Sequence, residues 1–467
     1  MVIVFVLVAL LVLSVLVAGN WWLWRRLFRD TTRGPGFVRR LGVAVIAGGW
    51  ALTIGALVAE RGGAPFWLQQ VLAWPGFLWL ALSIYLLLGV AAGEVVRPLL
   101  RRWLERRAGA VEAVRDPEPV PEEVTAAASP ATASLASTAP TSAATAVTTP
   151  APVSGTTSVT KSPPAPAPDE ASPSTSTSTP TPDSTDPSRP LAAPTRRLFV
   201  SRVVAGAAAA AAVGTVGYGT YGVLRGPKVK RVTVPLAKLP RAAHGYRIAV
   251  VSDVHLGPVL GRGFAQKVVD TINGTQPDLI AVVGDLVDGS VKDLGPAAAP
   301  LAQLRARHGA FFVTGNHEYF SGAGQWVDEV RRLGLRPLEN ARTELPHFDL
   351  AGVNDIAGES EGQGPDFAKA LGDRDKARAC VLLAHQPVQI HDAVDHGVDL
   401  QLSGHTHGGQ LWPGNFIADL ANPTLAGLER YGDTQLYVSR GAGAWGPPTR
   451  VGAESDITVI ELASRQA

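Results

Sequence analysis

Residues 247–255 read RIAVVSDVH, an apolar run that ends in an aspartate and a histidine two residues apart. A short apolar run with β-branched residues is typical of a buried strand. The chain holds four further runs of this kind: DLIAVV at 278–283, AFFVT at 310–314, CVLLA at 380–384 and DLQLS at 399–403. Residues 264–273 and 325–333, between the runs, have apolar residues at helical spacing. We therefore expect one α/β domain in residues 232–467.

Each expected strand is followed directly by a polar signature. The signatures are DVH at 253–255, GDLVD at 284–288, GNHE at 315–318, the single His385, and GHTH at 404–407. In α/β sheets the carboxyl ends of the strands converge on one crevice, so these loops are expected to meet there. Gly284, Gly315 and Gly404 would let the backbone pass close to the groups gathered in that crevice, because glycine has no Cβ.

The residue types in these signatures predict a two-metal site. Two nearby cations need terminal ligands on each and a negatively charged bridge, and imidazole with carboxylate suits Mn, Fe or Zn better than Mg or Ca. Asp253 and His255 lie two apart at a strand end and can face the same way, as can His405 and His407. All ten histidines of the chain fall between residues 244 and 407, and five of them belong to the signatures.

The five signatures together resemble the motif series of the calcineurin-like metallophosphoesterases, over about residues 246–462. The tail YVSRGAGAWGPPTRVG at 437–452, together with apolar N-terminal segments, is similar to a bacterial membrane-associated branch of that family. The resemblance implies an αββα sandwich of two mixed sheets. It also implies two divalent ions and their ligands: Asp253, His255 and His407 on one ion, Asn316, His385 and His405 on the other, and Asp285 as the bridge.

The same resemblance implies hydrolysis of a phosphoester by in-line attack of a metal-bridging hydroxide. His317 would stay off the metals and act as a proton donor or transition-state stabiliser near the leaving group. Asp288 either hydrogen-bonds a metal ligand or is a solvated loop carboxylate. Arg440 and Arg450, in the glycine-rich tail, either contact a phosphate or are ordinary surface arginines.

The first part of the chain, residues 1–107, has the composition of a membrane region. Three apolar runs, at 1–18, 41–59 and 71–96, approach the roughly 20 residues that a spanning helix needs. Arginine is absent before the first run and crowds after the first and third, which argues against a cleaved signal peptide and places both arginine-rich segments in the cytoplasm. We expect a multi-pass protein of the cytoplasmic membrane.

Residues 108–194 are rich in Ala, Pro, Ser and Thr, and this composition predicts a disordered linker. The stretch TRRLFVSR at 195–202 and the apolar run after it indicate, for residues 195–226, either a fourth spanning helix or an anchor resembling a twin-arginine signal. The second alternative would make the twin-arginine export machinery a partner. Both alternatives place the C-terminal domain outside the cytoplasm.

The net charge and the cysteine count limit the partners and cysteine sites that we expect. A net charge of +2 gives no indication of a nucleic-acid partner, and the single cysteine, Cys380, excludes an intrachain disulfide and a CxxC zinc site.

We expect a membrane-anchored phosphoesterase, most simply a phosphodiesterase, with the lipid bilayer as partner and a substrate that is either soluble or lipid-linked. Two alternatives stay open: a UDP-sugar-lipid or nucleotide pyrophosphatase, and a metal-stabilised scaffold with an inactive site.

Overall fold

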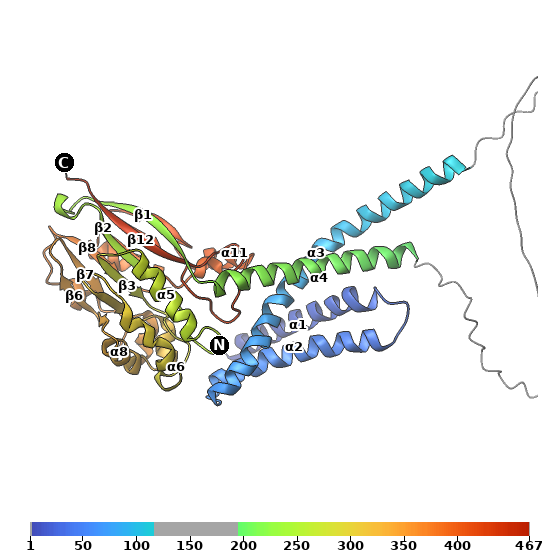
Figure 1. Ribbon diagram of the computed structural model, residues 1–467, viewed down its shortest axis with the longest axis horizontal. Helices are drawn as coiled ribbons and strands as arrows, with labels where there is room; N and C mark the ends of the chain where they lie inside the picture. The colour runs from blue at the N-terminus through green and yellow to red at the C-terminus, as the bar shows by residue number, and fades with distance from the viewer. Residues whose placement is uncertain (1, 116–194, 467) are drawn as a thin grey trace, which may run out of the picture. The chain divides into compact units, whose positions relative to one another are not determined.

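The computed structural model describes residues 2–115 and 195–466. Within these residues lie four long helices: α1 (Val2–Trp24), α2 (Phe37–Arg61), α3 (Phe66–Arg115) and α4 (Arg196–Leu224), as Figure 1 shows. All four are long and apolar enough to cross a membrane. They coincide with the four apolar runs of the sequence. α3 continues to Arg115, into the segment predicted as linker, and the rest of that prediction, 116–194, lies outside the described residues.

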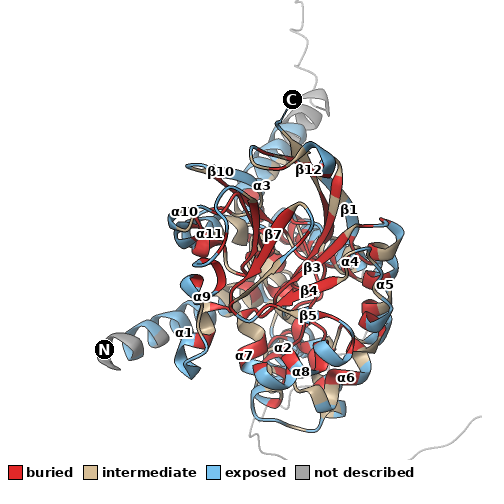
Figure 2. Cartoon of the chain, turned by 90° about the vertical axis from the view of Figure 1, so that its left-hand side faces the viewer, coloured by how far each residue is buried: buried red, intermediate tan, exposed pale blue. Residues whose placement is uncertain are grey.

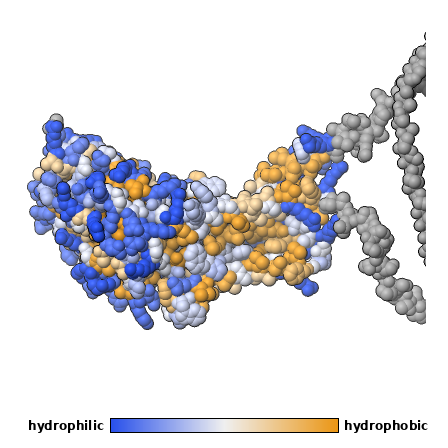
Figure 3. Space-filling view, viewed as in Figure 1, coloured by the Kyte–Doolittle hydropathy of each residue, from blue (hydrophilic) through white to orange (hydrophobic). Residues whose placement is uncertain are grey.

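Small and polar residues hold the long helices against one another. Gly49 of α2 lies directly under the indole of Trp79 in α3, where a Cβ would not fit. Thr53 Oγ1 donates to the carbonyl of Gly76 at 2.7 Å. Outward-facing apolar side chains give these helices a hydrophobic surface, whereas the α/β domain is largely hydrophilic (Figure 3). This contrast is what a bilayer around the helices requires.

The α/β domain contains two six-stranded mixed sheets. The first has the order β1-β12-β2-β3-β4-β5 and the second the order β10-β11-β9-β8-β7-β6. The strands of the first sheet are β1 (Lys228–Leu236), β2 (Tyr246–Val251), β3 (Leu279–Val283), β4 (Ala310–Val313), β5 (Arg336–Pro337) and β12 (Asp456–Ser464). Those of the second are β6 (Ala341–Glu344), β7 (Phe348–Gly352), β8 (Ala379–Leu383), β9 (Leu400–Ser403), β10 (Gly427–Tyr431) and β11 (Thr434–Val438).

The two sheets face each other across an apolar core. Val250, Val283 and Phe311 of the first sheet pack with Leu383 and Leu402 of the second. Figure 2 shows this burial as red strands between paler helices. The helices α5 (Arg262–Gly274), α6 (Val291–Ala298) and α8 (Ala323–Arg332) contribute to the core on the outer face of the first sheet, and α9 (Phe367–Leu371) and α10 (Ile390–Asp395) to that of the second.

This architecture confirms the predicted αββα sandwich of two mixed sheets. The five predicted strands are β2, β3, β4, β8 and β9, and the two predicted helices are α5 and α8. The strands β2, β3 and β4 run parallel to one another, and β8 runs parallel to β9. Their carboxyl ends therefore lie at one edge of each sheet, which brings the five polar signatures together.

Candidate metal centre

The signature loops leave their strands through strained backbone. Among the described non-glycine residues, those with positive φ include Asp253, His255, Asp285, His405 and His407, at 48° to 73°. The left-handed region costs a non-glycine residue about 1 kcal/mol or more, and such strain concentrates at functional sites. Sequence patterns could not reveal this feature, since nothing in the residue types demands a left-handed conformation.

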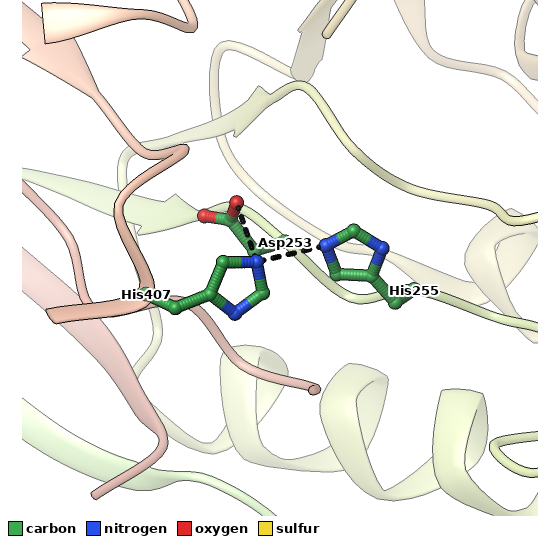
Figure 4. A group of neighbouring side chains, drawn as sticks. All are labelled: Asp253, His255 and His407. Carbon is green, nitrogen blue, oxygen red and sulfur yellow. Dashed lines mark hydrogen bonds and ion pairs between the residues drawn. The ribbon is translucent and has the colours of Figure 1, made fainter. Parts of the chain in front are cut away.

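One cluster of donor atoms, the Asp253 group, contains Asp253, His255 and His407. Their ligand atoms all lie within 4.8 Å of one another. His255 Nε2 and His407 Nε2 are 3.0 Å apart, and Asp253 Oδ1 is 3.5 Å from His407 Nε2 (Figure 4). The three side chains come from the ends of β2 and β9, so the group joins the two sheets.

A second cluster, the Asp285 group, contains Asp285, Asn316, His385 and His405. The carboxylate and the two imidazoles again place donor atoms within 4.8 Å of one another. His405 Nδ1 lies 3.0 Å from Asn316 Oδ1, which adds the amide oxygen to the set. These side chains follow β3, β4, β8 and β9, so four of the five predicted signatures meet in this cluster.

The His385 imidazole shows that the Asp285 group fits a cation. Its Nδ1 hydrogen-bonds the carbonyl of Val283 at 2.9 Å, so Nδ1 carries the hydrogen and Nε2 presents a lone pair. That buried Nε2 has no hydrogen-bond partner, yet Asp285 Oδ2 lies 3.1 Å away. A lone pair facing a carboxylate is repulsive unless a proton or a metal cation lies between them, which agrees with the raised pKa of His385 despite its burial.

Asp285 lies between the two groups. Its Oδ2 is 3.1 Å from His385 Nε2 and 3.8 Å from His255 Nε2. Its other oxygen, Oδ1, accepts the backbone N–H of His317 at 2.9 Å. Asp285, the predicted bridge, therefore places its carboxylate near an imidazole nitrogen of each group.

His317 and Asp288 form a pair beside the Asp253 group. His317 Nδ1 lies 2.7 Å from Asp288 Oδ1, which also accepts from His255 Nδ1 at 2.8 Å. Burial alone would raise the pKa of Asp288, but His255 and His317 lower it to about 2. Burial would lower the pKa of His317, but the hydrogen bond and charge of Asp288 raise it to about 9. Asp288 thus contacts one predicted ligand and one predicted proton donor.

Glu318 is a buried carboxylate to which sequence reasoning gave no role. Its oxygens accept the backbone N–H groups of Asp285 at 2.9 Å, Leu286 at 2.8 Å and Gly315 at 2.6 Å. Burial and the charge of Asp285 raise its pKa to about 7. Glu318 therefore ties the loop after β3 to the loop after β4. Its place as the last residue of GNHE was visible, but its inward direction was not.

The two predicted phosphate-binding arginines differ in environment. Arg450 is buried, and its guanidinium donates to the carbonyls of Gly443, His407 and Ala453 and to His407 Nδ1. These contacts orient His407. Arg440 is partly exposed and lies beside Gly408, in the segment that follows His407. Phosphate binding by either arginine stays a prediction.

The glycines of the signatures pack against site side chains, as predicted from their lack of a Cβ. A Cβ on Gly284, whose φ is 73°, would lie 2.5 Å from His385 Nδ1. A Cβ on Gly404 would lie 2.5 Å from Asp253 Oδ2. Any larger residue at either position would displace a donor group.

Comparison with known proteins agrees with this geometry. A model of the calcineurin-like phosphoesterase family matches residues 246–409. The chain is 38% identical over 259 residues to a transmembrane protein with metallophosphoesterase domain from Danio rerio, covering 52% of this chain and 59% of that protein. It is 35% identical over 243 residues to an uncharacterized metallophosphoesterase of Aquifex aeolicus (51% and 92% covered). It is 30% identical over 288 residues to the uncharacterized metallophosphoesterase YkuE of Bacillus subtilis (58% and 98% covered).

The extent of these matches differs between relatives. The chain spans less than two thirds of the length of the Danio rerio protein but nearly all of the Bacillus subtilis one. The region matched by the family model contains all five signatures and ends two residues after His407.

Proposed function

This chain belongs to the metallophosphoesterase family, and on that premise we propose that it is a membrane-anchored, metal-dependent phosphoesterase, with phosphodiesters as its substrate class. The observation that carries the proposal is the buried contact between His385 Nε2 and the Asp285 carboxylate at 3.1 Å, which needs a proton or a metal cation between the two atoms. A metal-stabilised scaffold would keep this contact as well, but it would have no need of His317, a partly exposed imidazole that Asp288 holds beside the two groups.

The two groups provide donors for two divalent ions of the Mn, Fe or Zn type. Asp253, His255 and His407 would hold one ion. Asn316, His385 and His405 would hold the other, with Asp285 shared between them. When bound, such ions neutralise the charge of a phosphoester and lower the pKa of water, so that an in-line displacement becomes possible at neutral pH.

His317 is suited to donate a proton to the leaving oxygen. Its Nδ1 is held by Asp288, which leaves Nε2 free to face a substrate, and its side chain is 15% exposed whereas those of His255 and His385 are fully buried. The raised pKa of His317 keeps it protonated at neutral pH in this setting. Asp288 would fix the orientation of both His317 and His255.

A hydrogen bond from Arg202 supports a catalytic domain outside the cytoplasm. The Nε of Arg202, near the start of α4, donates to the carbonyl of Thr31 in the arginine-rich connection between α1 and α2. The other end of α4, Leu224, leads within four residues to β1 at Lys228. The arginine-rich connection and the α/β domain thus lie at opposite ends of one spanning helix, and arginine-rich loops stay in the cytoplasm. We propose the cytoplasmic membrane as the location. Recognition of Arg196 and Arg197 by twin-arginine export machinery remains a separate prediction.

The test uses the full-length protein in detergent. Protein stripped of metal and resupplied with Mn, Zn or Fe is assayed with bis-p-nitrophenyl phosphate and with p-nitrophenyl phosphate, alongside Asp285→Ala and the surface control Asp328→Ala. We expect metal-dependent hydrolysis, with preference for the diester, that Asp285→Ala abolishes and Asp328→Ala leaves unchanged. A folded protein that binds the ions but hydrolyses neither compound would refute the proposal and favour the scaffold alternative.

A further inference from the structure

Helix α11 (Gly414–Ala421) exposes apolar side chains to an unusual degree. Phe416, Ile417 and Leu420 are 61%, 74% and 90% exposed, and none of the residues of α11 is buried. By contrast, α5 of the same domain buries Phe264 and Val268 against the first sheet. A soluble surface rarely carries several large apolar side chains on one short helix without a partner.

The segment just before α11 is fixed to the spanning helices. The hydroxyl of Tyr85, within the span of α3, donates to the carbonyl of Trp412 at 3.0 Å. Leu411 packs against the apolar cluster of the long helices, which includes Tyr85, Leu86 and Val216. Because α11 begins two residues after Trp412, it starts beside a helix that lies in the bilayer. α11 therefore adjoins a helix that is long and apolar enough to cross a membrane.

α11 is also joined to the metal centre. It contacts the short helix His407–Gly409, which carries a predicted ligand, and a Cβ on Gly409 would collide with Asn415 of α11. The route from the apolar surface of α11 to the Asp253 group is thus only a few residues long.

A second loop of the site also contacts the spanning helices. Val259, four residues after His255, packs with Ala56 of α2 and with Ala73 and Phe77 of α3. Glu60, at the end of α2, is close enough to interact electrostatically with Asp288 and His317. The loops that carry the Asp253 group are therefore seated on the end of the helix bundle.

The surroundings of His317 are apolar where they are exposed. Phe320 and Trp445 place their rings 5.6 Å and 5.7 Å from the His317 ring, and the two side chains are 76% and 53% exposed. Trp445 is tied to the α11 side of the site, because its backbone exchanges hydrogen bonds with the Gln410 side chain. An apolar rim beside the expected leaving-group position suits a molecule that carries acyl chains.

We propose that α11 is an interfacial helix that inserts Phe416, Ile417 and Leu420 into the leaflet beside the spanning helices, and that the site hydrolyses the phosphodiester of a phospholipid from that leaflet. Water adds to the phosphorus and one P–O bond breaks, which releases an alcohol and a phosphate monoester. The substrate part rests on the proposed phosphoesterase function. The position of α11 does not, and it can be measured without any activity.

The position of α11 is tested with fluorescent labels in the full-length protein. Cys380 is buried, so a label goes selectively to an introduced cysteine. The variants are Leu420→Cys and, as control, Leu428→Cys on the exposed strand β10. In vesicles of phosphatidylcholine and phosphatidylglycerol, we expect lipid-borne nitroxide to quench the label at 420 and aqueous iodide to quench the label at 428. Equal iodide quenching at both positions would overturn the proposal, as would shielding of position 420 from both quenchers, which would indicate a protein partner.

The substrate is tested by comparing a lipid with a soluble diester. The variant Phe416→Gln, Ile417→Gln, Leu420→Gln is compared with Leu428→Gln, using phosphatidylglycerol in vesicles and bis-p-nitrophenyl phosphate in solution. We expect the triple variant to lose about tenfold on the lipid and to stay within about twofold on the soluble diester, because only the lipid depends on insertion. Equal losses on both compounds, or none, would overturn the substrate assignment.

Two further outcomes separate this inference from the proposed function. A wild-type protein that hydrolyses bis-p-nitrophenyl phosphate but not phosphatidylglycerol would overturn the lipid assignment and leave the phosphoesterase intact. A wild-type protein that hydrolyses none of these compounds would refute the phosphoesterase itself, and the labels would still decide whether α11 enters the leaflet.

Discussion

The Asp253 group and the Asp285 group differ in how their hydrogen-bonding atoms are satisfied. In the Asp253 group, Arg450 always donates, so His407 Nδ1 accepts and the hydrogen of the neutral ring is on Nε2. That hydrogen can be donated to His255 Nε2 at 3.0 Å, because His255 Nδ1 is engaged with Asp288. A hydrogen bond therefore occupies the place where the ligand nitrogens converge.

In the Asp285 group a proton between His385 and Asp285 takes this place, which agrees with the raised pKa of His385. His385 uses its hydrogen on the carbonyl of Val283, and its other nitrogen faces the Asp285 carboxylate. A cation entering this group replaces that proton, whereas a cation entering the Asp253 group must replace the hydrogen on His407 Nε2 and lies near the positive charge of Arg450. The difference predicts that the Asp285 group binds its ion first and more tightly.

Removal of the shared carboxylate is the largest perturbation. Asp285→Ala takes a donor from both groups, so both binding steps should weaken, and kcat should fall by at least about a thousandfold. Isothermal titration with Mn²⁺ and diester hydrolysis measure the two effects, with Asp328→Ala as the exposed control. Retention of one unchanged binding step would show that Asp285 belongs to only one group.

His317→Asn should damage catalysis without touching either group. We expect kcat to fall about a hundredfold, since a positioned proton donor contributes on that scale. The metal titration should be unchanged, because His317 gives no donor atom to the Asp253 or Asp285 group. His308→Asn, outside the site, is the matched control. A changed metal titration would make His317 a ligand and contradict its assigned role.

Asp288→Asn should weaken metal binding by the Asp253 group only. The change weakens the hold on His255, so the second, weaker binding step should lose about tenfold in affinity while the first stays as it was. The measurement is the same two-step titration, and Asp293→Asn on the surface helix after it serves as control. An equal effect on both steps would mean that Asp288 supports the whole loop and not the Asp253 group.

Glu318→Gln should give the smallest effect and should appear in stability. The amide replaces one acceptor oxygen with an NH2 group. One of the three backbone N–H groups that donate to Glu318 therefore loses its acceptor, at a cost of about 1 kcal/mol. Thermal unfolding in detergent should show a lower midpoint than the wild type. Glu329→Gln, whose carboxylate pairs with Arg332 at the surface, should leave the midpoint nearly unchanged.

The sequence predicted the strands that carry the signatures because those strands are buried on both faces and read as continuous apolar runs. It did not predict the other seven strands. Of these, β7 and β11 are fully buried, whereas the edge strands β6 and β10 are polar and partly exposed. Edge strands depend on pairing with a neighbour, which no local pattern encodes.

The sequence predicted the candidate ligands of the site better than it predicted the contacts that support them. The signatures name the donor residues, and the structure brings all seven into two groups. Sequence reasoning did not reach Glu318, which acts through backbone contacts, or the engagement of Arg450 with His407. Both depend on the direction of a buried side chain, and that direction follows from the tertiary fold.

The dinuclear site is tested most directly by a Mn²⁺ titration of metal-free, full-length protein in which bound ions and bis-p-nitrophenyl phosphate hydrolysis are followed together. We predict two unequal binding steps, with hydrolysis appearing in proportion to the second, and His385→Ala removing the tighter step. Hydrolysis by the metal-free protein, or two ions bound with no hydrolysis at all, would contradict the claim that these groups form a dinuclear phosphoesterase site.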